Sequence, residues 1–416
     1  MSTRRSFLLS ATLASGALRA EPAAPAIAQL KNRRAEAQPI STAERQRRIE
    51  RAQRLMIENK IDAICLTGGT SLNYFSGVRW GNSERLFMMI IPARGDAWFI
   101  CPAFEEGRAR EQIAAGALPG ARVATWQEDN SPYALAAAEL KERGVATGRI
   151  GMEETAPFVF ADGIAKAAPA ASVTGATAVT AGCRMIKSPA EIALMRLASS
   201  VTLAAYEAAW KSLREGMSNQ EFGELIRSAF GAQGFAGYVS VQVGEYTALP
   251  HGSRAPQIIR ESSLVLIDDG CAVEGYQSDI SRTFVLGKAT DKMKAVFEIV
   301  HKAQRAALAA ARPGAPCQAV DAAARKVIVD AGYGPGYKYF THRVGHGIGM
   351  DGHEWPYLVP GNTLPLAAHM TFSDEPGIYI PGELGVRLED DMHITESGAE
   401  LLTAQSPSLE QPFGAG

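Results

Sequence analysis

Four acidic residues and one histidine in the C-terminal half of the chain could bind metal ions. They are Asp268, Asp279, His346, Glu375 and Glu389. The acids lie in otherwise apolar, strand-like runs, where a carboxylate is costly unless it is paired or bound to a cation. Their combined charge exceeds what one divalent ion needs, which favours two ions with bridging carboxylates. Oxygen-rich ligands with one imidazole favour Mn²⁺, although Co²⁺ or Zn²⁺ would also fit.

A pattern that occurs twice in the sequence would position these acids. Each copy has two helices followed by two strand-like runs. The helices are expected at residues 188–213, 218–230, 291–311 and 317–331, and the strand-like runs at 264–268, 276–286, 370–380 and 385–395. The pattern predicts an α+β domain with pseudo-twofold symmetry, in which helices back a curved antiparallel sheet. The alternatives are a chance similarity between two halves of the domain, and surface acids on an edge strand.

A separate α/β domain is expected before this one, over residues 41–181. Residues 42–59 have the apolar spacing of a helix, and residues 61–66, 86–91 and 97–101 have the composition of strands. This part of the chain has no cluster of metal-type ligands. The C-terminal domain is expected over residues 184–405, so the chemistry is assigned to it.

The N-terminus resembles a twin-arginine export signal. Arg4 and Arg5 precede a short apolar stretch, and small residues follow as far as residue 28. We expect residues 1–28 to be a signal peptide and the protein to be periplasmic or secreted; a frayed cytoplasmic N-terminus is the alternative. The apolar stretch is too short to span a membrane. An oxidising compartment would permit a disulfide, for which Cys65 and Cys101 are the best candidates.

The composition of the chain excludes several classes of protein. The 416 residues are 46% hydrophobic and 21% charged, as in an ordinary globular protein of two or three domains. The formal net charge of −2 leaves no global field to hold nucleic acid. The five cysteines have no CxxC spacing, so neither a zinc ribbon nor a disulfide framework is expected, and most are interpreted as buried small side chains.

Six ordered motifs resemble those of the pita-bread metallopeptidases, which include aminopeptidase P, prolidase, methionine aminopeptidase and the non-peptidase creatinase. The motifs are residues 266–270, 276–283, 345–349, 353–356, 375–379 and 385–390. Residues 41–181 resemble the creatinase/prolidase N-terminal domain, and residues 184–191 resemble the junction between the two domains. The resemblance covers nearly everything after residue 41.

The resemblance implies a role for each candidate residue. Asp268 would be a terminal ligand of one metal, Asp279 and Glu389 would bridge both metals, and His346 and Glu375 would complete the second. Glu375 would also act as general base, His353 would stabilise the oxyanion, and His251 would contact the substrate and help to move protons. His342 matches a residue near the leaving group. Arg387 would orient ligand carboxylates, and strand alternation suggests that Asp269 faces away from the metals and belongs to an ion pair.

The resemblance also implies a reaction, the hydrolysis of the bond before proline by a metal-activated water. Both an aminopeptidase and a dipeptidase fit. They differ in whether a cationic group closes the part of the substrate site beyond the proline, and the sequence does not show such a group. The alternatives are an exported hydrolase or lyase for a small non-peptide substrate, and an inactive binding protein. The expected partner is a proline-containing peptide, and a homodimer is a family-level expectation.

Overall fold

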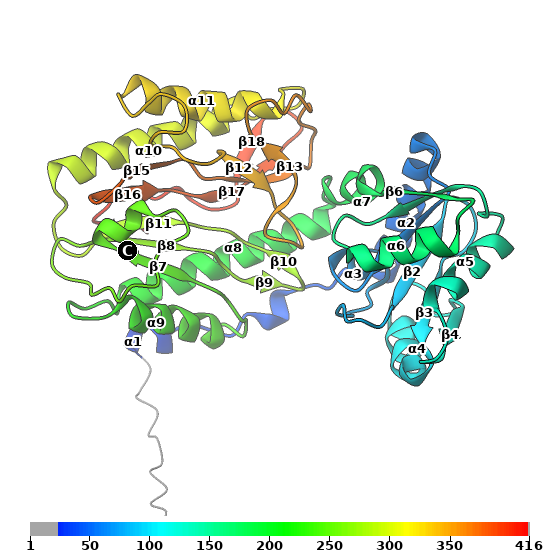
Figure 1. Ribbon diagram of the computed structural model, residues 1–416. Helices are drawn as coiled ribbons and strands as arrows, with labels where there is room; N and C mark the ends of the chain where they lie inside the picture. Colours follow the sequence, from blue (N-terminus) through cyan, green and yellow to red (C-terminus); the bar gives the residue numbers. More distant parts are fainter. Residues whose placement is uncertain (1–23, 415–416) are drawn as a thin grey trace, which may run out of the picture.

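The computed structural model of the protein describes residues 24–414, which form two domains (Figure 1). Most of the predicted signal peptide lies outside these residues. Its last part forms the short helix α1 (Pro25–Ala28), and Ile27 is buried in the hydrophobic core next to α8 and α9. Cleavage after Ala28 would remove this buried side chain from the core. The position of the cleavage site stays a prediction.

The N-terminal domain is built on one mixed sheet with the strand order β4-β3-β2-β1-β5-β6. Its strands are β1 (Ala63–Thr67), β2 (Met88–Pro92), β3 (Trp98–Pro102), β4 (Val123–Trp126), β5 (Arg149–Met152) and β6 (Ser172–Gly175). Its helices are α2 (Thr42–Asn59), α3 (Thr70–Ser76), α4 (Glu106–Ala115), α5 (Pro132–Glu142), α6 (Phe158–Ala167) and α7 (Thr177–Arg184). The expected α/β alternation is confirmed.

The C-terminal domain has helices on its two outer faces and strands between them (Figure 1). The helices are α8 (Pro189–Trp210), α9 (Asn219–Ala232), α10 (Asp291–Ala310) and α11 (Cys317–Asp330). The strands of its first half are β7 (Ser240–Val243), β8 (Leu264–Asp268), β9 (Ala272–Val273), β10 (Tyr276–Gln277) and β11 (Arg282–Val285). Those of its second half are β12 (Gly345–Gly347), β13 (Glu354–Leu358), β14 (Thr371–Asp374), β15 (Gly377–Ile380), β16 (Leu384–Arg387), β17 (Asp390–Ile394) and β18 (Ala399–Leu401).

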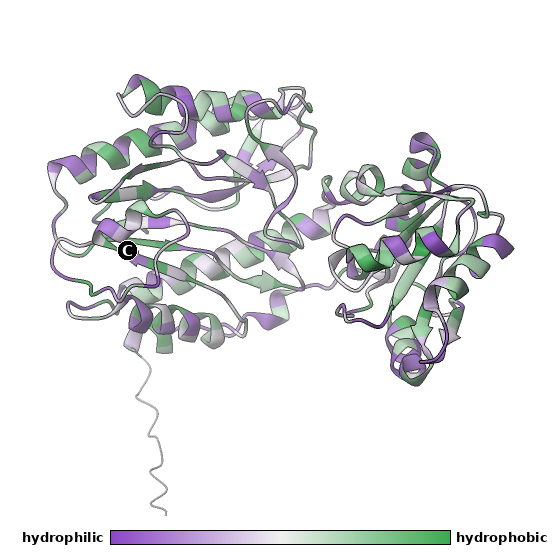
Figure 2. Ribbon diagram, viewed as in Figure 1, coloured by the Kyte–Doolittle hydropathy of each residue, from purple (hydrophilic) through white to green (hydrophobic). Residues whose placement is uncertain are grey.

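The predicted repeat of two helices and antiparallel strands is confirmed. Ser188 and Ser218 each begin a helix with a complete capping box, in which the side chain accepts from the N3 backbone N–H and the N3 glutamate accepts from the serine N–H. The strands form two main sheets, β11-β8-β7 and β13-β12-β14-β17-β18. In Figure 2, hydrophobic residues follow these strands and the inner faces of the helices.

The strand-like runs are less continuous than the sequence predicts. Residues 276–286, 370–380 and 385–395 each divide into two strands. In the second half, β14 pairs with β17 while β15 pairs with β16, and Pro376 at the break has no N–H for a ladder hydrogen bond. Asp279, Glu375 and Glu389 lie at these breaks. These three residues therefore lie outside the hydrogen-bonded strands, although the sequence predicts them inside continuous strands.

The Gly-His-Gly sequence at residues 345–347 suggests a tight turn, but these residues form the strand β12 between β13 and β14. The flanking glycines are needed for the close approach of neighbouring strands. A Cβ at Gly345 would lie 2.0 Å from the carbonyl oxygen of Ser373, and one at Gly347 would lie 2.6 Å from that of Glu354. His346 is therefore held in a strand with neighbours on both sides.

Two further expectations concern cysteines and the membrane. All five cysteines are buried and free within residues 24–414, so the candidate pair of Cys65 and Cys101 is not bridged. Both thiols lie in strands of the N-terminal sheet. None of the helices in this range is long and apolar enough to cross a membrane.

Candidate metal centre

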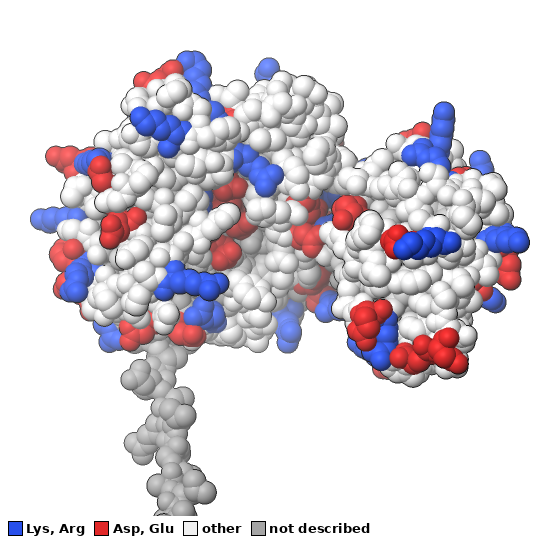
Figure 3. All heavy atoms as spheres, in the orientation of Figure 1, with Lys and Arg blue, Asp and Glu red and all other residues white. Residues whose placement is uncertain are grey.

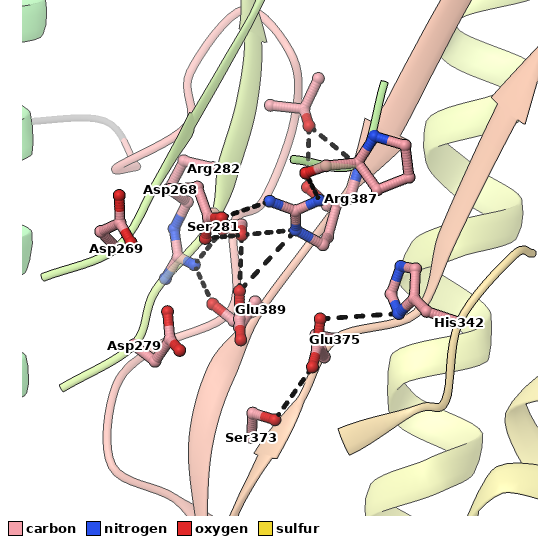
Figure 4. A network of polar contacts seen from close by, with 12 residues as sticks. Asp268, Asp269, Asp279, Ser281, Arg282, His342, Ser373, Glu375, Arg387 and Glu389 are labelled. Carbon is pink, nitrogen blue, oxygen red and sulfur yellow. Dashed lines mark hydrogen bonds and ion pairs between the residues drawn. The ribbon is translucent and has the colours of Figure 1, made fainter. Parts of the chain in front are cut away.

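The five predicted ligands converge between the two halves of the C-terminal domain. Figure 4 shows the four acids, and the His346 ring lies beside Glu375. Together with His353, these side chains supply three groups of ligand atoms, and within each group the atoms lie within 4.8 Å of one another. The groups are Asp268, Asp279 and Glu389; His346, Glu375 and Glu389; and Asp279, His346 and His353. The first two groups share Glu389, as two adjacent cation sites with a bridging carboxylate would require.

The imidazole of His346 shows that this donor set fits a cation. Burial lowers the pKa of His346 to about 3, with His353 adding to the effect, so the ring is neutral. Its Nδ1 lies 3.1 Å from the carbonyl oxygen of Gly347 and donates to it, which leaves a lone pair on Nε2. Nε2 lies 3.3 Å from Glu375 Oε1 and 3.8 Å from Asp279 Oδ2. A lone pair that faces two carboxylates calls for a cation between them.

The charge balance supports the same conclusion. Burial and the neighbouring acids raise the pKa values of Asp279 and Glu389 well above their ordinary range, and burial raises that of Glu375 to about 8. Within the described residues, Asp279 makes no ion pair with a lysine or arginine. Divalent cations would let all these carboxylates be ionised together.

Arg387 is the cation that contacts the predicted ligands directly. Its Nη2 donates to Asp268 Oδ2, and its Nε lies 3.8 Å from Glu389 Oε2 and 2.8 Å from Ser281 Oγ. Ser281 Oγ in turn lies 2.6 Å from oxygens of both acids. Arg387 therefore contacts two of the predicted ligands, although it ends β16 and Glu389 lies beyond that strand.

Arg282, which lies in one of the ordered motifs, has a structural rather than a ligand-orienting position. It does not contact the ligand carboxylates; its Nη2 lies 2.7 Å from Asp390 Oδ1 in a fully buried ion pair. Its Nη1 donates to the carbonyl oxygens of Ser281 at 3.0 Å and of Glu389 at 2.8 Å. Arg282 therefore joins backbone segments from both halves of the domain. The sequence places Arg282 in a motif without indicating this bridge.

The three predicted substrate-side histidines all border one cavity of about 260 Å³ that also contains the acids. His251 is exposed at Pro250–Gly252, and the ring of His353 stacks on that of His346 with centroids 3.7 Å apart. His342 Nε2 accepts from the Tyr379 hydroxyl at 2.8 Å, and its Nδ1 lies 3.7 Å from Glu375 Oε2. In Figure 3, acidic side chains lie in a hollow on the face of the C-terminal domain. Among residues 24–414, no comparable group of metal ligands lies at a larger cavity of about 590 Å³ in the N-terminal domain.

Two further residues, Asp269 and Arg343, line the same cavity. The sequence analysis placed Asp269 elsewhere and missed Arg343. Asp269 was expected to face away and form an ion pair, but it lines the cavity and has no ion-pair partner in the described chain. Its φ of 93° breaks the strand alternation on which the expectation rested. Arg343 also lines the cavity, and its guanidinium lies 4.2 Å from the centroid of the Tyr357 ring. The sequence signal that could have identified Arg343 is its position just before the motif at residues 345–349.

Comparisons with known proteins agree with this arrangement. The sequence profile of Metallopeptidase family M24 matches residues 193–396, and that of the Creatinase/Prolidase N-terminal domain matches residues 48–186. The chain is 32% identical to an Xaa-Pro dipeptidase of Lactobacillus delbrueckii subsp. lactis, over 87% of this chain and 98% of the relative. It is 35% identical to the probable dipeptidase PepE of Mycobacterium tuberculosis, over 85% and 92%. The crystal structure of dipeptidase PepE from Mycobacterium ulcerans superposes with a TM-score of 0.84 at 33% identity, over 90% of this chain and 99% of that one.

Proposed function

The chain belongs to Metallopeptidase family M24, and on this basis we propose that it is an Xaa-Pro dipeptidase that uses two divalent metal ions. Asp268, Asp279, His346, Glu375 and Glu389 would hold the ions, and Mn²⁺ is the proposed metal because oxygen donors predominate. The preference for proline is supported by the relative described as an Xaa-Pro dipeptidase. The homodimer stays a prediction, which sedimentation of the purified protein would test.

The residues around the cavity suggest how the reaction would proceed. Ions bound there would supply Lewis acidity, which polarises a carbonyl group and makes water more acidic. The Glu375 carboxylate would accept a proton from the attacking water. His353 would donate a hydrogen bond to the negative charge that develops on the carbonyl oxygen. His251 would contact the substrate, and the neutral His342 would lie beside Glu375.

The position of Arg343 in the cavity favours a dipeptidase over an aminopeptidase. It lines the cavity, and within residues 24–414 its guanidinium has no carboxylate partner and no side-chain hydrogen bond. A guanidinium can bind a carboxylate through two parallel hydrogen bonds, and stacking on Tyr357 restricts its orientation. Arg343 would thus bind the free carboxylate of a dipeptide, a group that a longer peptide does not present next to the scissile bond.

Replacing Arg343 with methionine should raise the KM for Xaa-Pro dipeptides about 10- to 100-fold, which corresponds to the loss of hydrogen bonds to a charged group. The kcat should change little, because the metal ligands are intact. The KM for dipeptides with an amidated C-terminus should be high and should not depend on Arg343. Lys338→Met is a matched control, because Lys338 also lies over an aromatic ring but outside the cavity.

The same assays separate the alternatives. Equal turnover of free and amidated substrates would contradict the dipeptidase assignment and favour an aminopeptidase. Metal binding without turnover of any peptide would favour an enzyme with a small non-peptide substrate. A protein that binds no divalent metal would fit the inactive binding protein.

We also propose that the protein is exported by the twin-arginine pathway, on the basis of Arg4, Arg5 and the apolar stretch that follows them. Such export of a folded protein would allow the metal to be loaded before translocation. Changing both arginines to lysine should keep the protein in the cytoplasm, as measured by fractionation and by the N-terminal sequence of the product. Equal periplasmic amounts of both forms would refute this proposal.

A further inference from the structure

His353 lacks side-chain hydrogen bonds to any residue in the described range, so its position depends on the loop that carries it. This loop, residues 348–353, connects β12 to β13. His353 lines both the metal-site cavity and a second cavity of about 270 Å³. Its ring stacks on that of His346 but has no hydrogen bond to hold it in place, so the loop backbone must supply much of the constraint.

Two acidic residues near His353 tie the loop to the rest of the molecule. Asp351 Oδ2 lies 2.6 Å from Arg184 Nη2, and Asp351 Oδ1 accepts from the Thr70 hydroxyl. Glu354 Oε1 pairs with the same Nη2 of Arg184, and its Oε2 lies 3.3 Å from Lys187 Nζ. The Asp351 N–H also donates to Glu354 Oε1 at 3.0 Å, which closes the loop on itself.

These contacts form an ion-pair cluster of Asp351, Glu354, Arg184 and Lys187, in which only the Asp351 side chain is substantially exposed, at 37%. The side chains of Lys187, Glu354 and Arg184 are 2%, 4% and 9% exposed. Burial opposes the ionisation of Glu354, but Lys187 and Arg184 hold its pKa at about 2, so the cluster is charged. A Cβ at Gly349 would lie 2.9 Å from Glu354 Oε2 and 3.0 Å from Lys187 Cε, which shows how closely the loop packs on the cluster.

The members of the cluster and the Thr70 hydroxyl that binds Asp351 come from both domains. Thr70 begins α3 and Arg184 ends α7 in the N-terminal domain, whereas Lys187 lies in the connection to α8. Asp351 and Glu354 belong to the C-terminal domain and are separated from Arg184 by 167 and 170 residues of sequence. We propose that this ion-pair cluster positions His353 over the metal centre, so that the N-terminal domain helps to shape the active site.

The proposal rests on the proposed function only for the catalytic role of His353. Its first test needs no turnover. In Glu354→Gln, amide hydrogen exchange over residues 348–353 should be at least about tenfold faster than in the wild type, because one partner of a buried charge pair is lost. Thr70→Val removes one hydrogen bond and should accelerate exchange in the same segment. This milder change keeps the test available where Glu354→Gln does not fold.

The matched control is Glu139→Gln in the N-terminal domain. Glu139 is also a nearly buried glutamate that binds two cations, Arg122 and Arg143, and it lies outside both cavities around His353. Exchange in residues 348–353 should be unchanged in this variant. Unchanged exchange in both Glu354→Gln and Thr70→Val would overturn the proposal.

The second test measures turnover and metal content. Glu354→Gln should lower kcat about 10- to 100-fold, the effect of a displaced catalytic group, with KM changed less than about twofold and metal content unchanged. Lys187→Arg should retain most of kcat, and Lys187→Met should not.

The decisive comparison uses His353→Ala as background. If Glu354 acts through His353, adding Glu354→Gln to His353→Ala should lower kcat no further. Equal fold-losses in both backgrounds would show a general structural role and overturn the proposal. Absence of turnover in the wild type would contradict the proposed function, whereas the exchange test would still decide the role of the cluster.

Discussion

Replacing Asp279 with alanine is expected to abolish both metal binding and peptide hydrolysis. Asp279 supplies ligand atoms to two of the three groups, one with Asp268 and Glu389 and the other with His346 and His353. Its carboxylate therefore lies between the two halves of the site, and no neighbouring arginine or lysine of the described chain pairs with it. The measurement is metal content by plasma mass spectrometry, where we expect two equivalents in the wild type, together with hydrolysis of an Xaa-Pro dipeptide.

Asp269→Asn is the control for this experiment, because Asp269 lines the same cavity but belongs to none of the three groups. It should keep its metal. Added Mn²⁺ should raise the melting temperature of the wild type and of Asp269→Asn but not that of Asp279→Ala. The metal-free Asp279→Ala protein should be no less stable than the metal-free wild type, since the change removes one of several acids that repel each other. Full metal occupancy in Asp279→Ala would contradict the ligand assignment.

The convergence of the five candidate ligands could be predicted because their chemistry is local in the sequence. Acids in apolar runs are conspicuous, and Asp268 and Asp279 lie close enough along the chain to suggest one hairpin. The exact backbone at these acids could not be predicted. Asp269 has a positive φ that reverses the expected direction of its side chain, and Glu375 lies where strand pairing changes partner.

The groups that support the site were harder to predict, because their partners are distant in the sequence. Arg282 contacts the carbonyl oxygen of Glu389 across 107 residues, and Arg184 reaches Glu354 across 170. An arginine or glutamate in a motif does not show by itself whether it binds a ligand, a backbone carbonyl or another charge. Arg343 was missed for the same reason, since its stacking partner Tyr357 comes from the neighbouring strand.

Replacing His353 with alanine should lower kcat about 10²- to 10³-fold and leave metal content unchanged, the range for removal of one oxyanion donor. The geometry alone also allows another role, because His353 lies with Asp279 and His346 in one group of potential ligand atoms. Two observations favour the oxyanion role. The five other residues already account for two adjacent cation sites, and the ring of His353 lies face to face with that of His346 at the wall of the cavity. Burial and Arg343 lower its pKa, so it would act as a neutral imidazole that donates through one nitrogen.

His369→Ala is the matched control for His353→Ala. His369 is a partly exposed histidine that bonds to His393 and Glu396 away from the cavity, so its loss should not change kcat. A loss of metal in His353→Ala would make His353 a ligand, and undiminished turnover would remove it from the mechanism. Retained metal with a large fall in kcat and a nearly constant KM is the result that only a donor to the transition state explains, because a ligand would change occupancy and a binding residue would change KM.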